Sequence, residues 1–332
     1  MPFRDVVGQP LAVEMLRRGL AQGRLHHALL FFGPDGVGKE LAAFSLACAV
    51  ACEREPGEGC GSCPACHRVL TSSAEGARVP LHPDVLVVER GLYSKEIIGK
   101  DEKTDVSVDQ IRRVVLERVN FPPHEARERV VIVRRAEEMS PGAANALLKT
   151  LEEPPSHTRF VLLSARPGEL LPTIRSRTQP IRFAPLADEH IVAILVSRGV
   201  SRELAEQAAG LAGGSVEAAA ARAAPEQSEE RTRAIEALQR AASAPLHEAL
   251  EVTSEYGNSG DDRRLLAEHL AALETAEAIE LRRLVLSGAD DARIDAAIAR
   301  FSTARSVEGA LDRNANVPLA LEAAWLALRR GR

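Results

Sequence analysis

Aromatic residues are scarce in this chain of 332 residues: they make up 3% of it, and Trp325 is the one tryptophan. Proteins that bind single-stranded nucleic acid stack bases on aromatic side chains, so this composition disfavours a base-stacking platform. An excess of positive charge is also missing. The chain has 42 Lys and Arg residues against 47 Asp and Glu residues, a net charge of -5, which gives no global reason to expect a protein that coats nucleic acid.

Long apolar runs are absent as well. No run approaches the roughly 20 residues that a membrane helix needs, and the N-terminal segment "MPFRDVVGQP" lacks the apolar core of a signal peptide. We therefore expect a soluble cytoplasmic protein with no membrane partner. Hydrophobic residues still account for 45% of the chain, enough for real cores, and the length favours two or three domains.

Composition changes along the chain and predicts where the domains lie. Up to about residue 183, the runs "ALLFF", "PDVLVVE", "RVVIVRR" and "RFVLLSA" have strand length and alternate with helical patterns, which is typical of a parallel sheet wrapped by helices. Beyond that point Ala, Leu, Glu and Arg dominate at helical spacing. We predict an α/β core over residues 1–183, a small helical domain over 184–225 and a helical C-terminal domain over 226–332. We interpret "APEQSEER" as the linker between the helical domains and "EYGNSGDDR" as a loop.

A glycine-rich loop, "GPDGVGKE", joins a predicted strand to a predicted helix. Gly33, Gly38 and Lys39 fit the phosphate-binding pattern GxxxxGK[ST], and Gly36 lies between them. Backbone N–H groups converge on phosphate at such a strand-to-helix turn. However, Glu40 stands where the pattern has the hydroxyl that binds magnesium, and it would add negative charge beside a triphosphate.

The next strand lacks a second requirement of a magnesium-dependent ATPase, a carboxylate at its end. The run "RVVIVRR" ends in Arg134 and Arg135, and guanidinium groups cannot hold a metal ion. Glu137 and Glu138 follow, and we interpret them as a solvated first helical turn. The magnesium site is therefore expected to be lost, so we predict no ATP turnover by the isolated chain. Gly33, Gly36, Gly38 and Lys39 could still cradle a phosphate or a nucleotide without metal, which leaves ATP or ADP binding open.

Four cysteines follow the helix of the glycine-rich loop. Cys52, Cys60, Cys63 and Cys66 form the pattern CxxxxxxxCxxCxxC in "CEREPGEGCGSCPAC". Four thiolates in a loop rich in Gly and Pro suit a closed, tetrahedral zinc site of structural type. A disulfide is disfavoured in a chain without an export signal. Cys48, one helical turn before Cys52, is expected to face the core instead.

Several segments together resemble the clamp-loader ATPases of the AAA+ class, and among them the delta-prime type of subunit of the bacterial DNA polymerase III clamp loader. The resemblance covers nearly the whole chain. The segment "AANALLKTLEEPP" is its most specific part. The other segments are "VVGQPLAVEMLRRGLAQGRLHHALLFFGPDGVGK", "HPDVLVVE", "VSVDQIRRV", "VLLSARPGELLPTIRSRTQPIRF" and "NANVPLALEAAWLAL". The family usually carries an acidic pair where Arg134 and Arg135 stand, and the delta-prime type commonly lacks ATPase activity of its own. The same four-cysteine module occurs in these subunits.

The resemblance also implies a role for "TIRSRTQP". In the family this segment reads Ser-Arg-Cys, and its arginine reaches into the ATP site of the neighbouring subunit. The match falls on Ser176 and Arg177, with Thr178 in place of the cysteine. Ser164 matches a polar nucleotide sensor, although serine is also ordinary at a strand end. Glu217 stands where active relatives often carry a phosphate-sensing arginine, which is a further departure from active hydrolysis.

The resemblance implies a three-domain AAA+ protein whose C-terminal domain serves oligomerisation. It would be the non-hydrolysing subunit of the loader that opens the sliding clamp and places it on primed DNA, next to gamma/tau-type and delta-type subunits. Such a chain would belong to the DNA polymerase III holoenzyme and to an ATPase assembly without being catalytic alone. Two alternatives remain open. One is an active DNA-dependent ATPase that recruits Glu137 or Glu138 to the metal. The other is a DNA-binding protein that reads DNA through its cysteine loop, although "EREPGEG" is acidic and repels phosphate.

Overall fold

The computed structural model describes residues 2–73, 79–99, 105–223, 235–240, 245–254, 256–312 and 315–330. It divides into two compact units, Met1–Ala220 and Ala221–Arg332, which are described separately below. The predicted linker, residues 224–231, lies outside the described residues. Among the residues described, no helix is long and apolar enough to cross a membrane.

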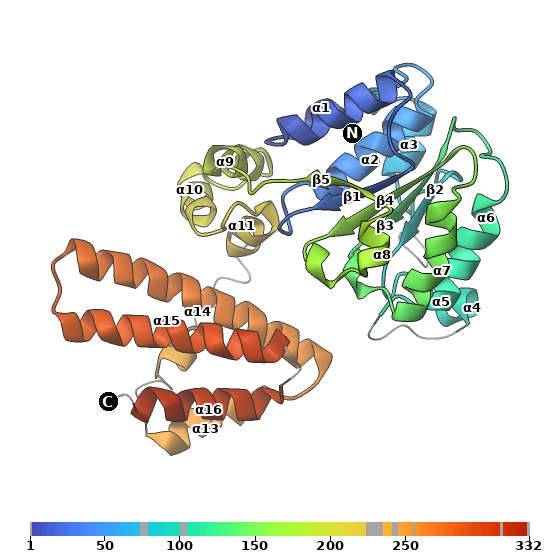
Figure 1. The fold of residues 1–332 in the computed structure, drawn as a ribbon. Helices are drawn as coiled ribbons and strands as arrows, with labels where there is room; N and C mark the ends of the chain where they lie inside the picture. Colours follow the sequence, from blue (N-terminus) through green and yellow to red (C-terminus); the bar gives the residue numbers. More distant parts are fainter. Residues whose placement is uncertain are drawn as a thin grey trace. The chain divides into compact units, whose positions relative to one another are not determined.

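The first unit is built on a parallel sheet of five strands (Figure 1). Their order across the sheet is β2-β3-β4-β1-β5. The strands are β1 (Ala28–Phe32), β2 (Val85–Val88), β3 (Arg129–Val133), β4 (Thr158–Ser164) and β5 (Gln179–Arg182). The four predicted strands are β1 to β4, and β5 is an additional edge strand that pairs with β1. The predicted α/β class, a parallel sheet with helices followed by a helical C-terminal part, is confirmed.

Helices between the strands, together with α1, cover both faces of the sheet. The longer ones are α1 (Pro10–Ala21), α2 (Lys39–Ala51), α3 (Pro64–Leu70) and α7 (Pro141–Glu152). Three more helices follow the last strand: α9 (Asp188–Ser197), α10 (Arg202–Gly210) and α11 (Val216–Ala223). Shorter turns of helix are η1 (Phe3–Asp5), α4 (Lys95–Ile98), α5 (Val108–Gln110), η2 (Ile111–Leu116), α6 (Glu117–Val119), η3 (Ala136–Glu138), η4 (Pro167–Glu169) and α8 (Pro172–Arg175).

Alternate core residues of strands β1 to β4 belong to different hydrophobic cores. Leu29 and Phe31 of β1 pack in the core that contains α1, α2 and α3. Ala28 and Leu30 of the same strand pack in the core that contains α7 and the segment of α4 to α6. Successive side chains of a strand point to opposite faces, so a sheet covered on both sides reads as a continuous apolar run. This is why runs such as "ALLFF" have no polar residue.

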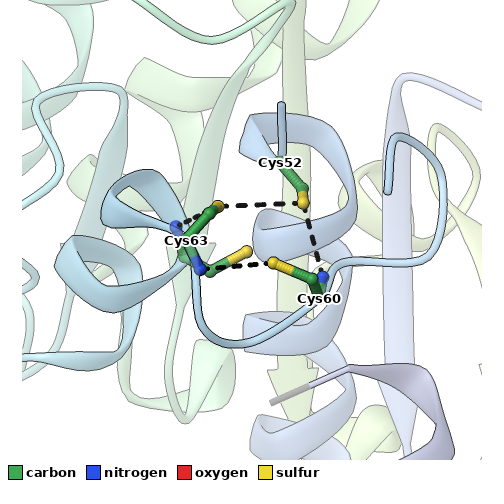
Figure 2. A group of neighbouring side chains, drawn as sticks. Cys52, Cys60 and Cys63 are labelled. Carbon is green, nitrogen blue, oxygen red and sulfur yellow. Dashed lines mark hydrogen bonds between the residues drawn. The ribbon is translucent and has the colours of Figure 1, made fainter. Parts of the chain in front are cut away.

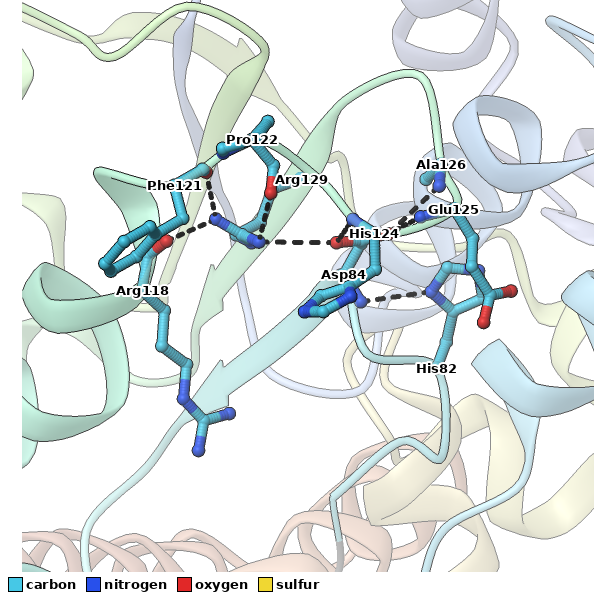
Figure 3. Close-up of polar contacts among 9 residues, drawn as sticks. All are labelled: His82, Asp84, Arg118, Phe121, Pro122, His124, Glu125, Ala126 and Arg129. Atoms are coloured by element: carbon cyan, nitrogen blue, oxygen red, sulfur yellow. Dashed lines mark hydrogen bonds and ion pairs between the residues drawn. The ribbon is translucent and has the colours of Figure 1, made fainter.

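A buried carboxylate fastens the loop between α6 and β3 to the start of β2 (Figure 3). Both oxygens of Asp84 accept backbone N–H bonds, from His124 at 2.7 Å, Glu125 at 2.8 Å and Ala126 at 2.9 Å. The guanidinium of Arg129 lies 3.4 Å from the same carboxylate and also donates to the carbonyls of the loop. Both side chains are buried. The contact explains the aspartate in "HPDVLVVE", which sequence reasoning used without a role.

The second unit is helical. Its described residues include the helices α13 (Leu246–Ser254), α14 (Gly260–Leu286), α15 (Asp291–Asp312) and α16 (Val317–Arg330). Leu266, Leu270, Val307 and Trp325 belong to its core, and the indole N–H of Trp325 donates to Thr253 at 3.2 Å. The predicted loop over residues 255–263 is only half correct, because α14 begins inside it. Ser259 caps that helix by accepting the N–H of Asp262, whose carboxylate accepts the N–H of Ser259 in return. The predicted division into three domains remains a prediction.

Candidate functional site

The phosphate loop lies where β1 ends and α2 begins. Gly33 and Gly36 have φ values of +149° and +71°, which residues other than glycine rarely adopt. A Cβ on Gly33 would overlap the carbonyl oxygen of Phe183, at the end of β5. Gly38, with φ +95°, precedes the first residue of α2. The loop glycines are thus required by the backbone path, and the strand–loop–helix context predicted for Gly33, Gly36, Gly38 and Lys39 is confirmed.

Lys39 folds back onto its own loop. Its ammonium group donates to the carbonyl oxygens of Gly33 and Pro34, both at 2.6 Å, and lies 3.4 Å from Asp35. The side chain is 8% exposed. These contacts satisfy the three donors of the ammonium group. A phosphate that binds Lys39 would therefore have to replace at least one of these three contacts.

The N-terminal end of α11 lies against the tip of the loop. The N–H of Val216 donates to the carbonyl of Gly36 at 2.9 Å, and a Cβ on Gly36 would overlap Ser215. Gln9 provides a second clamp, because its amide donates to Val37 at 3.1 Å and to Ala184 at 2.7 Å. Sequence reasoning missed Gln9, although it is part of the quoted segment "VVGQPL".

A cavity of about 760 Å³ opens beside the loop. The C-terminal ends of β3 and β4 reach it through Arg134, Arg135 and Ser164, as expected for ligand sites of parallel sheets. Ser164 also accepts the N–H of Arg166 at 3.1 Å, which is ordinary strand-end chemistry. Glu217 lines the cavity as well. The lining residues are Asp5, Val7, Asp35, Gly36, Val37, Gly38, Lys39, Glu40, Leu41, Glu89, Arg134, Arg135, Leu163, Ser164, Ala165, Leu186, Ile194, Ser197, Arg198, Val216, Glu217 and Ala220.

Glu40 and Arg134, the two departures at the metal position, contact each other. Nη2 of Arg134 forms an ion pair with Glu40, and Nη1 donates to Glu89 at 2.8 Å. Burial alone would lower the pKa of Arg134, but Glu40 and Glu89 raise it. The guanidinium is thus charged and occupied between two carboxylates. Sequence reasoning identified Glu40 and Arg134 separately but not their pairing, and it missed Glu89.

Glu137 and Glu138 lie in η3, past the end of β3, but they are not solvated. Glu137 accepts the N–H of Ala165 at 3.1 Å, while Glu138 pairs with Arg90 at 3.3 Å and with Arg135 at 3.5 Å. The side chain of Glu138 is 15% exposed. The expectation of a solvated turn is therefore wrong, because both carboxylates hold the backbone or side chains around the strand end. Neither lines the cavity.

The four predicted cysteine ligands converge in a buried cluster between α2 and α3 (Figure 2). The sulfur atoms of Cys52, Cys60, Cys63 and Cys66 all lie within 4.8 Å of one another. The Cys52 and Cys63 sulfurs are 3.8 Å apart. A tetrahedral site with Zn–S bonds of about 2.3 Å has edges of about 3.8 Å, so the donor set fits such a metal. Cys48 is buried in the core and is not part of the cluster, as expected.

Backbone N–H groups prepare the cluster to carry negative charge. The sulfur of Cys52 accepts from Glu55 at 3.2 Å, and the sulfur of Cys60 accepts from Cys63 at 3.2 Å. Hydrogen bonds lower the pKa of Cys60 to about 6, and the bond from the N–H of Ser62 has the largest effect. Burial raises the pKa of Cys66. The thiols of Cys60 and Cys66 thus have pKa values shifted in opposite directions, and a bound cation would favour the thiolate form of its ligands.

Arg177 lies just past α8 and does not line the cavity of its own chain. Its guanidinium forms an ion pair with Glu152 at the end of α7 and donates to the carbonyl of Thr173 at 3.0 Å. The side chain is 33% exposed. The predicted finger is therefore reachable from outside, and its present partner belongs to its own chain.

Comparison with known proteins extends these observations. Residues 8–187, just over half of the chain, match the model of a protein family described as DNA polymerase III, delta subunit. The chain is 36% identical over 191 residues to DNA polymerase III subunit tau of Bacillus subtilis, a match that covers 57% of this chain and 30% of that protein. It is 34% identical over 211 residues to subunit delta' of the same organism, covering 63% and 58%.

The relatives are longer than the part that is matched, since the chain spans less than a third of tau. Identity to tau is as high as identity to delta', so these likenesses concern the family as a whole. Among solved structures, a gamma subunit-related protein of Thermotoga maritima is 19% identical with a TM-score of 0.48, and the alignment covers 96% of this chain and 98% of that one.

Proposed function

The chain belongs, through residues 8–187, to the family described as DNA polymerase III, delta subunit, and from that premise we propose that it is a delta-prime-type clamp-loader subunit. In this proposal it works in the cytoplasm beside gamma/tau-type and delta-type subunits. The assembly places the sliding clamp on primed DNA. The chain hydrolyses no ATP itself and lends Arg177 to the ATP site of a neighbouring subunit.

The contact between Glu40 and Arg134 carries this proposal. An active site of this kind needs a hydroxyl and a strand-end carboxylate to hold magnesium. Here the two positions hold a carboxylate and a guanidinium that neutralise each other. Magnesium needs an octahedral shell of oxygen ligands, and the guanidinium of Arg134 supplies no oxygen and occupies the position of a ligand. This supports a chain without turnover of its own.

Arg177 can serve a neighbour even though the local site is inactive. A guanidinium placed against the transferring phosphate needs neither local magnesium nor a local acid, and it can raise the rate by about 10³- to 10⁵-fold. Its position outside its own cavity and its partial exposure support action on another chain. The competing interpretation is the ion pair with Glu152 alone, which would be worth about 0–1 kcal/mol at the surface.

We also propose that the metal held by Cys52, Cys60, Cys63 and Cys66 is zinc, in a structural role. Four cysteine ligands leave no open position for a substrate or water. The cysteines come from the end of α2, from the loop after it and from α3, so a bound ion would fasten that loop to the core. The proposed domains are the core (1–183), a helical lid (184–225) and a C-terminal oligomerisation domain (226–332).

The two alternative functions have less support. Glu137 and Glu138 are engaged by Ala165, Arg90 and Arg135, so recruiting either to a metal would break existing contacts. A DNA-reading cysteine loop would have to bring Glu53, Glu55 and Glu58 to phosphate, which opposes binding.

Co-purification tests the proposed function. The full chain is mixed with candidate gamma/tau-type and delta-type subunits of the same organism, and complexes are isolated by size. We expect a stable complex whose ATPase activity is stimulated by primed DNA and clamp, and no activity from the chain alone. Failure to join any loader subunit would contradict the proposal, as would turnover by the isolated chain.

A further inference from the structure

Two unusual residues of this chain, 94 positions apart, meet at one point of the nucleotide pocket. Glu40 is in the first turn of α2, and Arg134 directly follows β3. Nη2 of Arg134 pairs with Glu40, while Nη1 donates to Glu89 at 2.8 Å. The guanidinium therefore lies between the position of the phosphate-loop hydroxyl and the end of the neighbouring strand. Those are the two positions between which a magnesium ion is normally held.

The charges at this point are inverted rather than lost. An active site holds a divalent cation with oxygen ligands, among them a carboxylate at the strand end. Here the positive group is covalently attached to that strand end, and the carboxylates of Glu40 and Glu89 come from the loop helix and from the end of β2. Glu40 without Arg134 would add a second carboxylate near Glu89 with no cation between them. Arg134 without Glu40 would keep only Glu89 as its partner.

The guanidinium is held in place from several sides. Its side chain is 20% exposed, and its Cζ lies 5.8 Å from the centre of the Phe44 ring. Contact with an aromatic face adds to the attraction of the two carboxylates. Since Glu40 and Glu89 also raise its pKa, it stays charged over the whole usable pH range. A permanent cation thus lines the same cavity as Lys39.

The charge balance of the cavity limits what it can take. At the phosphate end, Lys39, Arg134 and Arg135 are balanced by Asp35, Glu40 and Glu89. An anion there gains from the loop N–H groups and the start of α2, but little from net charge. A third phosphate would face Glu40 and Glu89 without the metal ion that normally screens it.

The cavity also has apolar lining. Val7, Leu186 and Ile194 line it together with the charged Asp5, Arg198 and Glu217, and the three apolar side chains suit the flat apolar face of a base. We infer that Arg134 is the fixed cation of this pocket, in place of a divalent metal, and that the pocket takes a nucleoside diphosphate without metal. This inference rests on the proposed function only in one respect, namely that the pocket is a nucleotide site.

Titration of the purified full chain with a fluorescent ADP tests the inference, first in excess EDTA and then in excess magnesium at matched ionic strength. We expect equal affinities within about twofold, because no metal contributes to binding. We also expect ATP to bind no more tightly than ADP. Arg134→Gln should weaken ADP binding by about 10- to 150-fold, because Glu40 and Glu89 would then face the phosphates without the guanidinium that neutralises them. The exposed Arg112, outside the cavity, provides the control Arg112→Gln, which should leave the affinity unchanged.

Variants also test the inversion directly. The double variant Glu40→Thr with Arg134→Asp restores the usual residue types, so its ADP binding should become dependent on magnesium. The inference is overturned if magnesium raises the affinity of the parent by about tenfold or more, or if the parent binds no ADP at all. Retained affinity in a folded Arg134→Gln variant would overturn it too. None of these outcomes depends on the neighbour's site, so the role of Arg177 stands or fails separately.

Discussion

At the scale of single residues, Asp84 shows how one buried carboxylate can hold a loop. Its two oxygens accept three backbone N–H bonds and face Arg129. Burial alone would raise the pKa of Asp84, but the N–H groups and Arg129 together lower it. Removing the charge would leave the guanidinium of Arg129 buried without its partner, which is a costly arrangement.

We predict that Asp84→Asn lowers the free energy of unfolding at neutral pH by about 3–5 kcal/mol. A group with a lowered folded pKa stabilises the protein above its unfolded pKa of about 4, and that contribution is lost as the pH falls through the folded value. The difference between parent and variant should therefore shrink below about pH 4, as measured by denaturant unfolding across pH. Glu125→Gln, which changes an exposed ion pair of the same loop, serves as the control. An equal effect of both substitutions would refute the role of Asp84.

The pairing of Glu40 with Arg134 could not be read from the sequence. Each residue stands out there as a departure from a motif, and each suggests a lost metal site. Their contact, however, depends on the strand order, which brings the end of β3 near the loop after β1 across β4. Side chains 94 positions apart have no local signal of their partnership.

At the scale of elements, strands were the most predictable part of the fold. The runs that became β1 to β4 have continuous apolar centres because both faces of the sheet are covered there. The fifth strand, Gln179–Arg182, was missed because it is short, polar and contains Pro180. Proline is tolerated there because β5 is an edge strand. The start of α14 was missed inside a polar run, although Ser259 and Asp262 have the spacing of a capping box.

The cysteine loop is the element whose shape we expect to depend on a bound metal. We predict one zinc per chain by elemental analysis of protein purified without added metal. Cys63→Ser should abolish that metal and lower the melting temperature, because the loop between α2 and α3 loses its fixed shape. Cys48→Ala is the matched control, since Cys48 lies beside the cluster without belonging to it, and should keep one zinc per chain. A metal-free parent with a folded loop would contradict the prediction.

At the scale of the whole molecule, the chain keeps the glycine backbone of a phosphate loop, while Glu40 and Arg134 pair at the position where the motif would hold a metal. We predict no ATP turnover above background by the isolated chain, and no change in that background on Lys39→Ala. A sensitive phosphate-release assay with the parent and Lys39→Ala measured side by side provides the check. Turnover by the parent that disappears in the variant would show that the local site is active after all.

The predictions that involve other chains are the hardest to read from one chain. The sequence predicted the glycine-rich turn between β1 and α2 and the convergence of the four cysteines, because each is a local motif with its own chemistry. A single chain cannot display the neighbour that Arg177 would reach, since the site exists only where two subunits meet. That arginine therefore distinguishes most sharply between a clamp-loader subunit that acts in trans and an inert relative.

The most direct test is the ATPase rate of a reconstituted loader that carries Arg177→Ala in this chain. Because the guanidinium would act on one neighbouring site, we expect the complex to form normally while that site loses about 10³-fold or more of its activity and clamp loading falls. Arg175→Ala, an exposed arginine of the same segment, should leave the rate unchanged. If the Arg177→Ala loader hydrolyses ATP and loads clamps at the rate of the unmodified loader, the central claim is wrong.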